Sequence, residues 1–466
     1  MCRKCKKTRK LNRRLLLKGA AAGAAGVAIS PIIGRSPLFA GGVGGNNKFL
    51  IVINMLGGND GLNMVIPGGD ARGAYETRRP NIQLSALNPD TGELNRPTGS
   101  EGLPLLGLEN GYDLHYSMTG LRQMWLNGEL HVVNKVGYPQ ANLSHFTSQD
   151  IYSSGMREYG GPNGDGRGWL GRFSDLYCSN PAEPMGVVSV GLGRRRDFEG
   201  DLTEALITNA SNATEENGGP LSTFRVDGED FAYRRDHDLR IQTIAQALDI
   251  ESTPPTEPAT SIYTTEKSAA GLVERVKAGV DGWDDPETYN LGTSLGRYLR
   301  GVSQLLQGIN DFRTKVFYTG MGGFDTHSIQ LNRHESLMTQ LDDAVSAFRA
   351  DLVARNLWDR CAVVVISEFG RRNFENGSEG TDHGHGNCFM VVGGNVNGGL
   401  SGLYQESEIA DVNQVVYDPT KAPNEAGGGY DFREIYADII GSHLNLNPAN
   451  VFPETYNNTG SLNLFV

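Results

Sequence analysis

Five short polar segments of the sequence hold the side chains that are best suited to metal or ester chemistry. They read GGNDGLN at 57–63, NLSHF at 142–146, GGFDTH at 322–327, SEFGRR at 367–372 and GTDHGHG at 380–386. The candidate metal ligands in them are Asp60, His145, Asp325, His327, Glu368, Asp382, His383 and His385. A set that mixes carboxylates with imidazoles suits zinc, manganese or iron, whereas calcium and magnesium prefer oxygen ligands alone. The sequence therefore predicts a divalent metal site of one or two ions, with zinc or manganese as the expected cofactor.

These segments follow predicted β-strands. Short continuous apolar runs indicate buried strands at 49–56, 130–136, 185–190, 314–319, 361–367 and 389–392. Helical patterns lie between them, at 118–127, from about residue 144, at 330–355 and at 431–444. This alternation is typical of an α/β protein with a large, mostly parallel sheet sandwiched by helices. Because ligands of such sheets bind beyond the carboxyl ends of the strands, we expect the polar segments to meet at one edge.

Several of these side chains also have a purely structural interpretation. Ser144 lies where a helix begins, so it is either the N-cap of that helix or a nucleophile. A metal ion and a helix N-terminus beside it would make its oxygen easier to ionise. Asp60 fits a turn in Asn-Asp-Gly, and Asp325 with His327 fits a cap before the 330–355 helix. The sequence leaves these alternatives open.

The segment at 380–386 gives the most specific signal. Two imidazoles that flank a glycine, next to an aspartate, seldom arise as turn chemistry. Glu368 is less specific, because it can pair with Arg371 or Arg372 instead of a metal ion. The other five histidines are expected to be surface or packing residues: His115, His131, His237, His334 and His443.

Charge is unevenly distributed along the chain. Residues 1–40 hold ten basic and no acidic residues, so the remaining residues carry 54 acidic and 32 basic ones. An acidic body repels phosphate backbones and anionic lipids, which argues against nucleic acid as a partner. The polar stretch at about 195–290 is expected to be an insertion with exposed linkers.

The first 40 residues have the features of an export signal. A basic head with Arg13-Arg14 precedes a weakly apolar, Ala/Gly-rich run at 19–33 that is too short for a membrane span. The pattern resembles a twin-arginine signal, with cleavage expected after Ala40. We therefore expect a periplasmic or secreted protein without a stable membrane anchor, in which residues 41–466 form a single large domain.

Together, the motifs resemble a known family. The twin-arginine start, LGGNDGLNMVIP, NLSHFTSQDIYSSG, GGFDTH, SEFGRR and GTDHGHGNCFMVVGG resemble the exported family called domain of unknown function 1501. That family is similar to the alkaline-phosphatase-like superfamily, which includes sulfatases and phosphatases. The resemblance implies a large parallel sheet between helices, with two metal sites at the strand ends.

The resemblance also implies roles for individual residues. Asp60 would bind one ion, while Asp325 and His327 would bind the other, completed by His383 or His385. Ser144 falls near the position of the nucleophile. In addition, Phe369 follows Glu368 where those enzymes have a histidine, so His145 or Asp382 is expected to replace that ligand.

Two functions are compatible with these motifs and with the resemblance. The first is metal-dependent hydrolysis of a small anionic phosphate or sulfate ester, in which Ser144 attacks and Arg371 or Arg372 balances the substrate's charge. The second is a non-catalytic exported scaffold or binding protein that retains the fold and at most one metal ion and binds an exported protein. The sequence leaves open whether the protein is an enzyme.

Overall fold

The computed structural model describes the greater part of the chain after residue 46. The described residues are 47–85, 92–94, 96, 100, 103–157, 164–177, 186–192, 195–200, 206–208, 283–306, 314–411, 417, 421–423 and 425–466. The expected signal at 1–40 and most of the expected insertion at 195–290 lie outside the described residues. No described helix is long and apolar enough to cross a bilayer.

The six apolar runs of the sequence lie in one sheet, which has nine strands in the described residues. These are β1 (Phe49–Leu56), β5 (Leu130–Gly137), β6 (Val187–Val190), β7 (Leu206–Thr208), β8 (Val316–Gly322), β9 (Cys361–Ile366), β10 (Asn387–Val392), β11 (Gly399–Ser401) and β12 (Tyr430–Asp431). Their order is β11-β5-β10-β9-β1-β8-β6-β7, and β12 also pairs with β5. Strand β1 lies near the middle, in parallel register with both β8 and β9. The α/β class with a large, mostly parallel sheet is therefore confirmed.

Strand β10 runs against its neighbours. It pairs antiparallel with both β5 and β9, whereas the other pairs of this sheet are parallel. The chain that leaves the carboxyl end of β9 therefore re-enters the sheet at the same edge, at the start of β10. This direction places the whole connection 367–386 at the edge where β1 and β8 also end.

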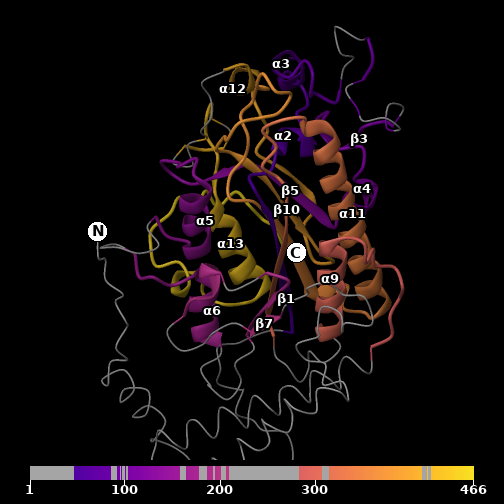
Figure 1. Cartoon of the computed structure of the whole chain (residues 1–466). Coiled ribbons are helices and arrows are strands. Elements are labelled where there is room, and N and C mark those ends of the chain that lie inside the picture. Colours follow the sequence, from indigo (N-terminus) through magenta and orange to yellow (C-terminus); the bar gives the residue numbers. More distant parts are fainter. Residues whose placement is uncertain are drawn as a thin grey trace, which may run out of the picture.

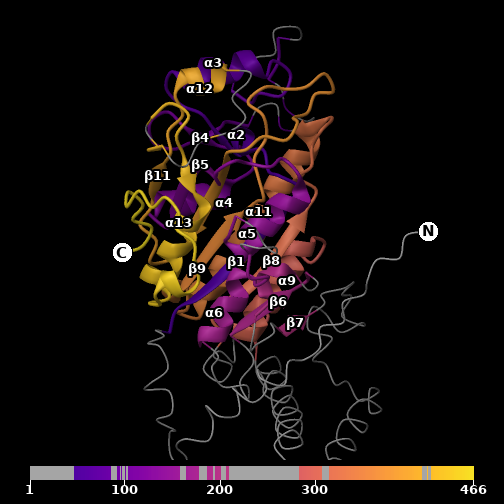
Figure 2. The same ribbon diagram turned by 90° about the vertical axis from the view of Figure 1, so that its left-hand side faces the viewer.

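Helices cover both faces of the sheet (Figures 1 and 2). One face carries α4 (Thr119–Leu126), α9 (Ser294–Leu306) and α11 (Gln330–Ala354), and the other carries α5 (His145–Ser154), α6 (Trp169–Tyr177) and α13 (Phe432–Asp438). Helix α3 (Ala71–Arg78) lies beyond the strand ends, beside α12 (Glu406–Ala410). Successive residues of a strand point to opposite faces, so Ile51 and Ile53 pack in the first core while Leu50 and Val52 pack in the second.

The remaining elements are short. A small sheet joins β2 (Val65–Ile66), β4 (Asp113–Leu114) and β3 (Leu106–Gly107) beside the one-turn helix α2 (Gly61–Met64). Helix α12 (Glu406–Ala410) packs on α3. The closing helix expected at 431–444 is shorter than predicted, because α13 passes into a π-helical turn at Ile439–His443.

Candidate metal centre

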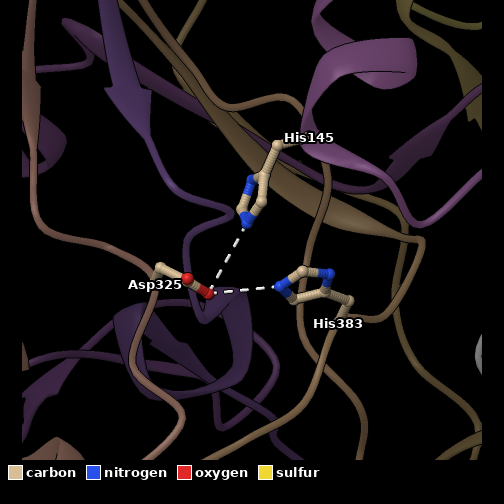
Figure 3. Close-up of side chains that lie close together, drawn as sticks. All are labelled: His145, Asp325 and His383. Carbon is tan, nitrogen blue, oxygen red and sulfur yellow. Dashed lines mark hydrogen bonds and ion pairs between the residues drawn. The ribbon is translucent and has the colours of Figure 1, made fainter.

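Three side chains from distant parts of the sequence converge at the carboxyl edge of the sheet (Figure 3). His145 is the first residue of α5, Asp325 follows β8, and His383 lies in the connection before β10. Their ligand atoms lie within 4.8 Å of one another. The carboxylate Oδ1 of Asp325 is 3.6 Å from Nε2 of His145 and 3.2 Å from Nε2 of His383.

His327 adds a third imidazole to this group. Its Nε2 lies 3.0 Å from Oδ1 of Asp325 and 3.0 Å from Nε2 of His383. The side chains of His327 and Asp325 are 45% and 46% exposed, so this side of the group is open to a ligand from solution. The convergence therefore consists of one carboxylate and three imidazoles.

Each of the three imidazoles is held by an oxygen on its other ring nitrogen. Nδ1 of His145 lies 2.9 Å from Glu368, Nδ1 of His327 lies 3.0 Å from Asp382, and Nδ1 of His383 lies 2.8 Å from the carbonyl oxygen of Leu143. A carbonyl or an ionised carboxylate can only accept a hydrogen bond, so each Nδ1 carries the proton. In the neutral rings, the lone pair is then on Nε2, the atom that faces Asp325. Metal-binding histidines in proteins are held in the same way.

The spacing of these atoms suits a metal ion. Zinc bound tetrahedrally at 2.0–2.1 Å from nitrogen sets its ligand atoms about 3.4 Å apart, close to the 3.0, 3.2 and 3.6 Å found around Oδ1 of Asp325. Moreover, the Nε2 atoms of His327 and His383 face each other at 3.0 Å. Two lone pairs at this distance repel unless a proton or a cation lies between them. The donor set therefore fits a divalent ion such as zinc.

Electrostatics keep the central carboxylate ionised. Partial burial alone would raise the pKa of Asp325, but the hydrogen bond and charge of Arg371 outweigh it, and the pKa falls to about 2. Nη2 of Arg371 lies 2.6 Å from Oδ1 of Asp325. The hydrogen bond that His145 donates to Glu368 raises the pKa of His145, whereas burial lowers that of His383. A carboxylate that stays ionised is a ligand across the physiological pH range.

Glu368 holds the ring of His145 through a hydrogen bond from its Nδ1. Its carboxylate is 2% exposed and accepts hydrogen bonds from Nδ1 of His145, the backbone N–H of Gly57 and the amide of Gln149. Burial would raise the pKa of Glu368, but these hydrogen bonds outweigh it and lower the pKa. The centroid of the Phe369 ring lies 4.7 Å from the ring centroids of both His145 and His383. Glu368 and Phe369 therefore contact and orient two imidazoles of the group.

The loops that carry these residues approach one another closely. Gly57, at the end of β1, has φ +122°, and a Cβ there would lie 2.5 Å from the backbone nitrogen of Asp325. A Cβ on Gly58 would overlap the ring of Phe369. Glycines at these two positions let the turn after β1 pass between the turns after β8 and β9. The expected meeting of the polar segments at one sheet edge thus depends on this turn.

Ser144 lies at the N-cap position of α5, but its hydroxyl does not cap the helix. Instead, the backbone N–H of Ser144 donates to Oδ1 of Asn142 at 2.8 Å. Its neighbours both belong to the site, since the carbonyl of Leu143 holds His383 and the ring of His145 faces Asp325. A half-buried hydroxyl without an observed hydrogen bond, between these two residues, is chemically available.

Three sequence-predicted site residues occupy other places. Asp60 is buried in an ion pair with Arg79, whose Nη1 lies 2.6 Å away, and is not one of the converging ligands. His385 is 2% exposed, and its Nε2 accepts from the backbone N–H of Tyr138 at 3.2 Å, so His383 and not His385 faces Asp325. The guanidinium of Arg371, expected to balance the charge of a substrate, is fully buried and pairs with Asp325.

Arg371 donates hydrogen bonds to the loops that follow β1 and β8 and to the connection before β10. It donates to the carbonyl oxygens of Gly57, Gly58, Phe324 and Thr381 as well as to Asp325. No sequence signal predicted these contacts, or the contact of His383 with the carbonyl of Leu143, because every residue carries a backbone acceptor. Asp382 is placed outside the converging atoms, where it orients His327.

A cavity of about 610 Å³ lies near the start of α5. Tyr138, Asn142, Thr147, Arg157 and Glu454 are among the residues that line it, and none of the converging metal ligands does. The candidate centre is therefore distinct from this cavity.

Residues 297–447 of the chain match the model of a family described as Protein of unknown function (DUF1501). This segment contains Asp325, His327, Glu368 and His383 but not His145. No curated protein matches the chain.

Solved structures that resemble the chain include a protein in the alkaline phosphatase superfamily from Vibrio parahaemolyticus, at 11% identity and TM-score 0.33, over 84% of this chain and 71% of that chain. Another is the lipoteichoic acid synthase LtaP from Listeria monocytogenes, at 8% identity and TM-score 0.32, over 83% and 76%. A third is the PsFucS1 sulfatase from Pseudoalteromonas sp., at 10% identity and TM-score 0.31, over 90% and 74%. Scores this low carry no argument about activity, which has to come from the residues of the site.

Proposed function

We propose that the protein is an exported, metal-dependent hydrolase of a phosphate or sulfate ester, with Ser144 as its nucleophile. One observation carries the proposal. The Nε2 atoms of His145 and His383 converge with the carboxylate of Asp325. In the sequence, Ser144 lies between Leu143, whose carbonyl contacts His383, and the ligand His145, and its hydroxyl does not cap α5. A hydrolase of this kind needs a bound cation, an activated hydroxyl and an open approach, and all three requirements can be met here.

Asp325, His145 and His383 would hold the ion, with His327 as a further ligand. When bound, a divalent ion polarises an oxygen of the ester and offsets the negative charge that develops in the transition state. Glu368, Asp382 and the carbonyl of Leu143 keep the three rings oriented, so that little reorganisation is needed when substrate binds.

Ser144 would attack the phosphorus or sulfur atom. Its Oγ forms the new bond as the bond from that atom to the substrate's alcohol oxygen breaks, and the hydroxyl proton of Ser144 leaves with the alcohol. Water then cleaves the ester on Ser144, which releases phosphate or sulfate and restores the hydroxyl. The N-terminus of α5 adds a partial positive charge beside the attacking oxygen.

The experiment is turnover of aryl phosphates and aryl sulfates by the purified protein, loaded in turn with zinc, manganese and iron. We expect hydrolysis of one ester class that Ser144→Ala reduces at least 100-fold. Thr147→Ala is the matched control, because Thr147 is an exposed hydroxyl residue of the same helix and is not part of the site. Turnover that is equal in the Ser144→Ala and wild-type proteins refutes the nucleophile.

The same assay separates the second function. A protein that binds one metal ion per chain and turns over neither ester class would be a binding protein that keeps the site. Export is tested independently by fusing residues 1–40 to a reporter protein. We expect the reporter to reach the periplasm, and expect Arg13→Lys with Arg14→Lys to hold it in the cytoplasm.

A further inference from the structure

A buried hydrogen-bond network lies beneath the two loops that carry the metal ligands. Its centre is Gln330, the first residue of α11, which is fully buried. The amide oxygen of Gln330 accepts hydrogen bonds from the hydroxyls of Thr326 at 3.0 Å and Thr381 at 2.7 Å. One oxygen atom therefore joins the loop after β8 to the connection between β9 and β10.

Both threonines lie within two residues of proposed metal ligands. Thr326 lies between Asp325 and His327, and Thr381 precedes His383 by two residues. Both threonines are at most 1% exposed, and the backbone N–H of Thr381 donates to the carbonyl of Thr326 at 3.1 Å. The distance between the ligand atoms of the two loops therefore depends on how Gln330 holds them.

Asp60 fixes the orientation of Gln330. The amide nitrogen of Gln330 donates to Oδ2 of Asp60 at 2.5 Å. Because a carboxylate can only accept, the amide cannot turn over, and its oxygen has to face the threonines. Nη1 of Arg79 holds the same carboxylate at 2.6 Å, and both partners of this ion pair are at most 1% exposed.

Arg79 carries the network on to the connection before His383. Its guanidinium donates to the carbonyl oxygens of Asn373 at 2.9 Å and Arg372 at 2.7 Å. A buried, fully charged group of this kind is costly to rearrange, since any movement would leave a charge without its partner. The Asp60–Arg79 pair is therefore a rigid base for both ligand loops.

We propose that Asp60 is a positioning residue for the metal centre, which acts through Gln330 on Thr326 and Thr381 and so sets the spacing of Asp325, His327 and His383. The inference rests on the proposed metal site but not on its catalytic activity. It gives Asp60 a role different from that of a ligand, because the cation paired with its carboxylate is the guanidinium of Arg79.

The test is Co²⁺ binding to the metal-free full-length protein, followed by the visible absorption of the bound ion and by a chelator competition for affinity. The double variant Thr326→Val with Thr381→Val removes both hydroxyls and leaves every ligand in place. We expect it to weaken Co²⁺ binding about 10-fold and to shift the absorption bands. Asp60→Asn is expected to do the same.

The matched control is Thr319→Val. Thr319 is also fully buried, lies on β8 and has a hydroxyl without an observed partner, so its substitution is expected to leave Co²⁺ affinity and absorption unchanged. Asp325→Asn, which removes a ligand, sets the scale for complete loss. Thermal midpoints of the metal-free variants separate lost fold stability from altered metal geometry.

Each outcome decides the matter. Wild-type affinity and absorption in the double threonine variant overturn the proposal, and that variant decides even where Asp60→Asn does not fold. Loss of binding in Asp60→Asn as severe as in Asp325→Asn, with the double threonine variant unaffected, would make Asp60 a ligand. Wild-type protein that fails to bind Co²⁺ removes the inference together with the proposed function, whereas binding without ester turnover removes only the latter.

Discussion

Replacing Glu368 by glutamine tests whether the oriented histidine is what makes the site a metal centre. The substitution keeps the size of the side chain and removes the negative charge that accepts from Nδ1 of His145 at 2.9 Å. A hydrogen bond to a charged group is worth about 1.5–3 kcal/mol, which corresponds to about a 10- to 150-fold change in an equilibrium constant. Mutation of the residue that holds a metal-binding histidine typically weakens affinity by about 10–100-fold. The two figures agree, so we expect Glu368→Gln to bind Co²⁺ or Zn²⁺ about 10- to 100-fold more weakly.

The assay is chelator competition at pH 7, with thermal unfolding of the metal-free proteins in parallel. Glu375→Gln is the control, because Glu375 lies in the same connection and accepts hydrogen bonds from Asn81 and the backbone N–H of Ile82 but contacts no imidazole. It is expected to lose stability without losing metal affinity. Equal metal affinity in Glu368→Gln and the wild-type protein, with both folded, would refute the orientation argument.

Three further predictions follow from the same contacts. His383→Gln should abolish Co²⁺ binding, while His385→Gln should change it less than twofold in the folded protein; the reverse order would mean that the wrong imidazole has been assigned to the site. Arg371→Met should lower the free energy of unfolding by about 3 kcal/mol, since several buried carbonyls lose their donor, whereas Arg372→Met, whose side chain is half-buried, should change it by less than 1 kcal/mol in urea titrations. Burial holds the pKa of His443 at about 4, so this ring is neutral in the folded protein but takes up a proton near pH 6.5 when unfolded. Between pH 7 and pH 5 this group therefore lowers the free energy of unfolding by about 2 kcal/mol. His443→Gln should reduce the pH dependence of the free energy of unfolding by that amount. An unchanged pH dependence in this variant would show that His443 does not titrate as stated.

Local patterns predicted the elements of this protein well. Strand β1 begins and ends as its apolar run indicated, and the long helix at 330–355 is present as α11. A short continuous apolar run bounded by turn residues is typical of a strand buried inside a sheet, and this property is already visible in a window of a few residues. The same reasoning placed five polar segments after predicted strands and predicted that they would meet.

The direction of β10 could not be predicted in this way. An apolar strand reads alike in either direction, and only pairing with β5 and β9 decides that it is antiparallel. This choice brings the start of β10, and with it His383, to the edge where β1 and β8 end. The site therefore depends on a feature of the sheet that no local pattern contains.

What the sequence determined by itself was the supply of carboxylates and imidazoles and the strands that carry them, because residue type and periodicity are local properties. What only the tertiary structure decided was which of them face one another. His383 and His385 are two residues apart in one loop, yet one points to Asp325 and the other packs against Tyr138. Likewise, Asp60, which the sequence predicted to be a metal ligand, forms an ion pair with the buried guanidinium of Arg79, the C-cap residue of α3. Such choices depend on contacts between residues that are distant in the chain, and those contacts exist only once both cores have packed.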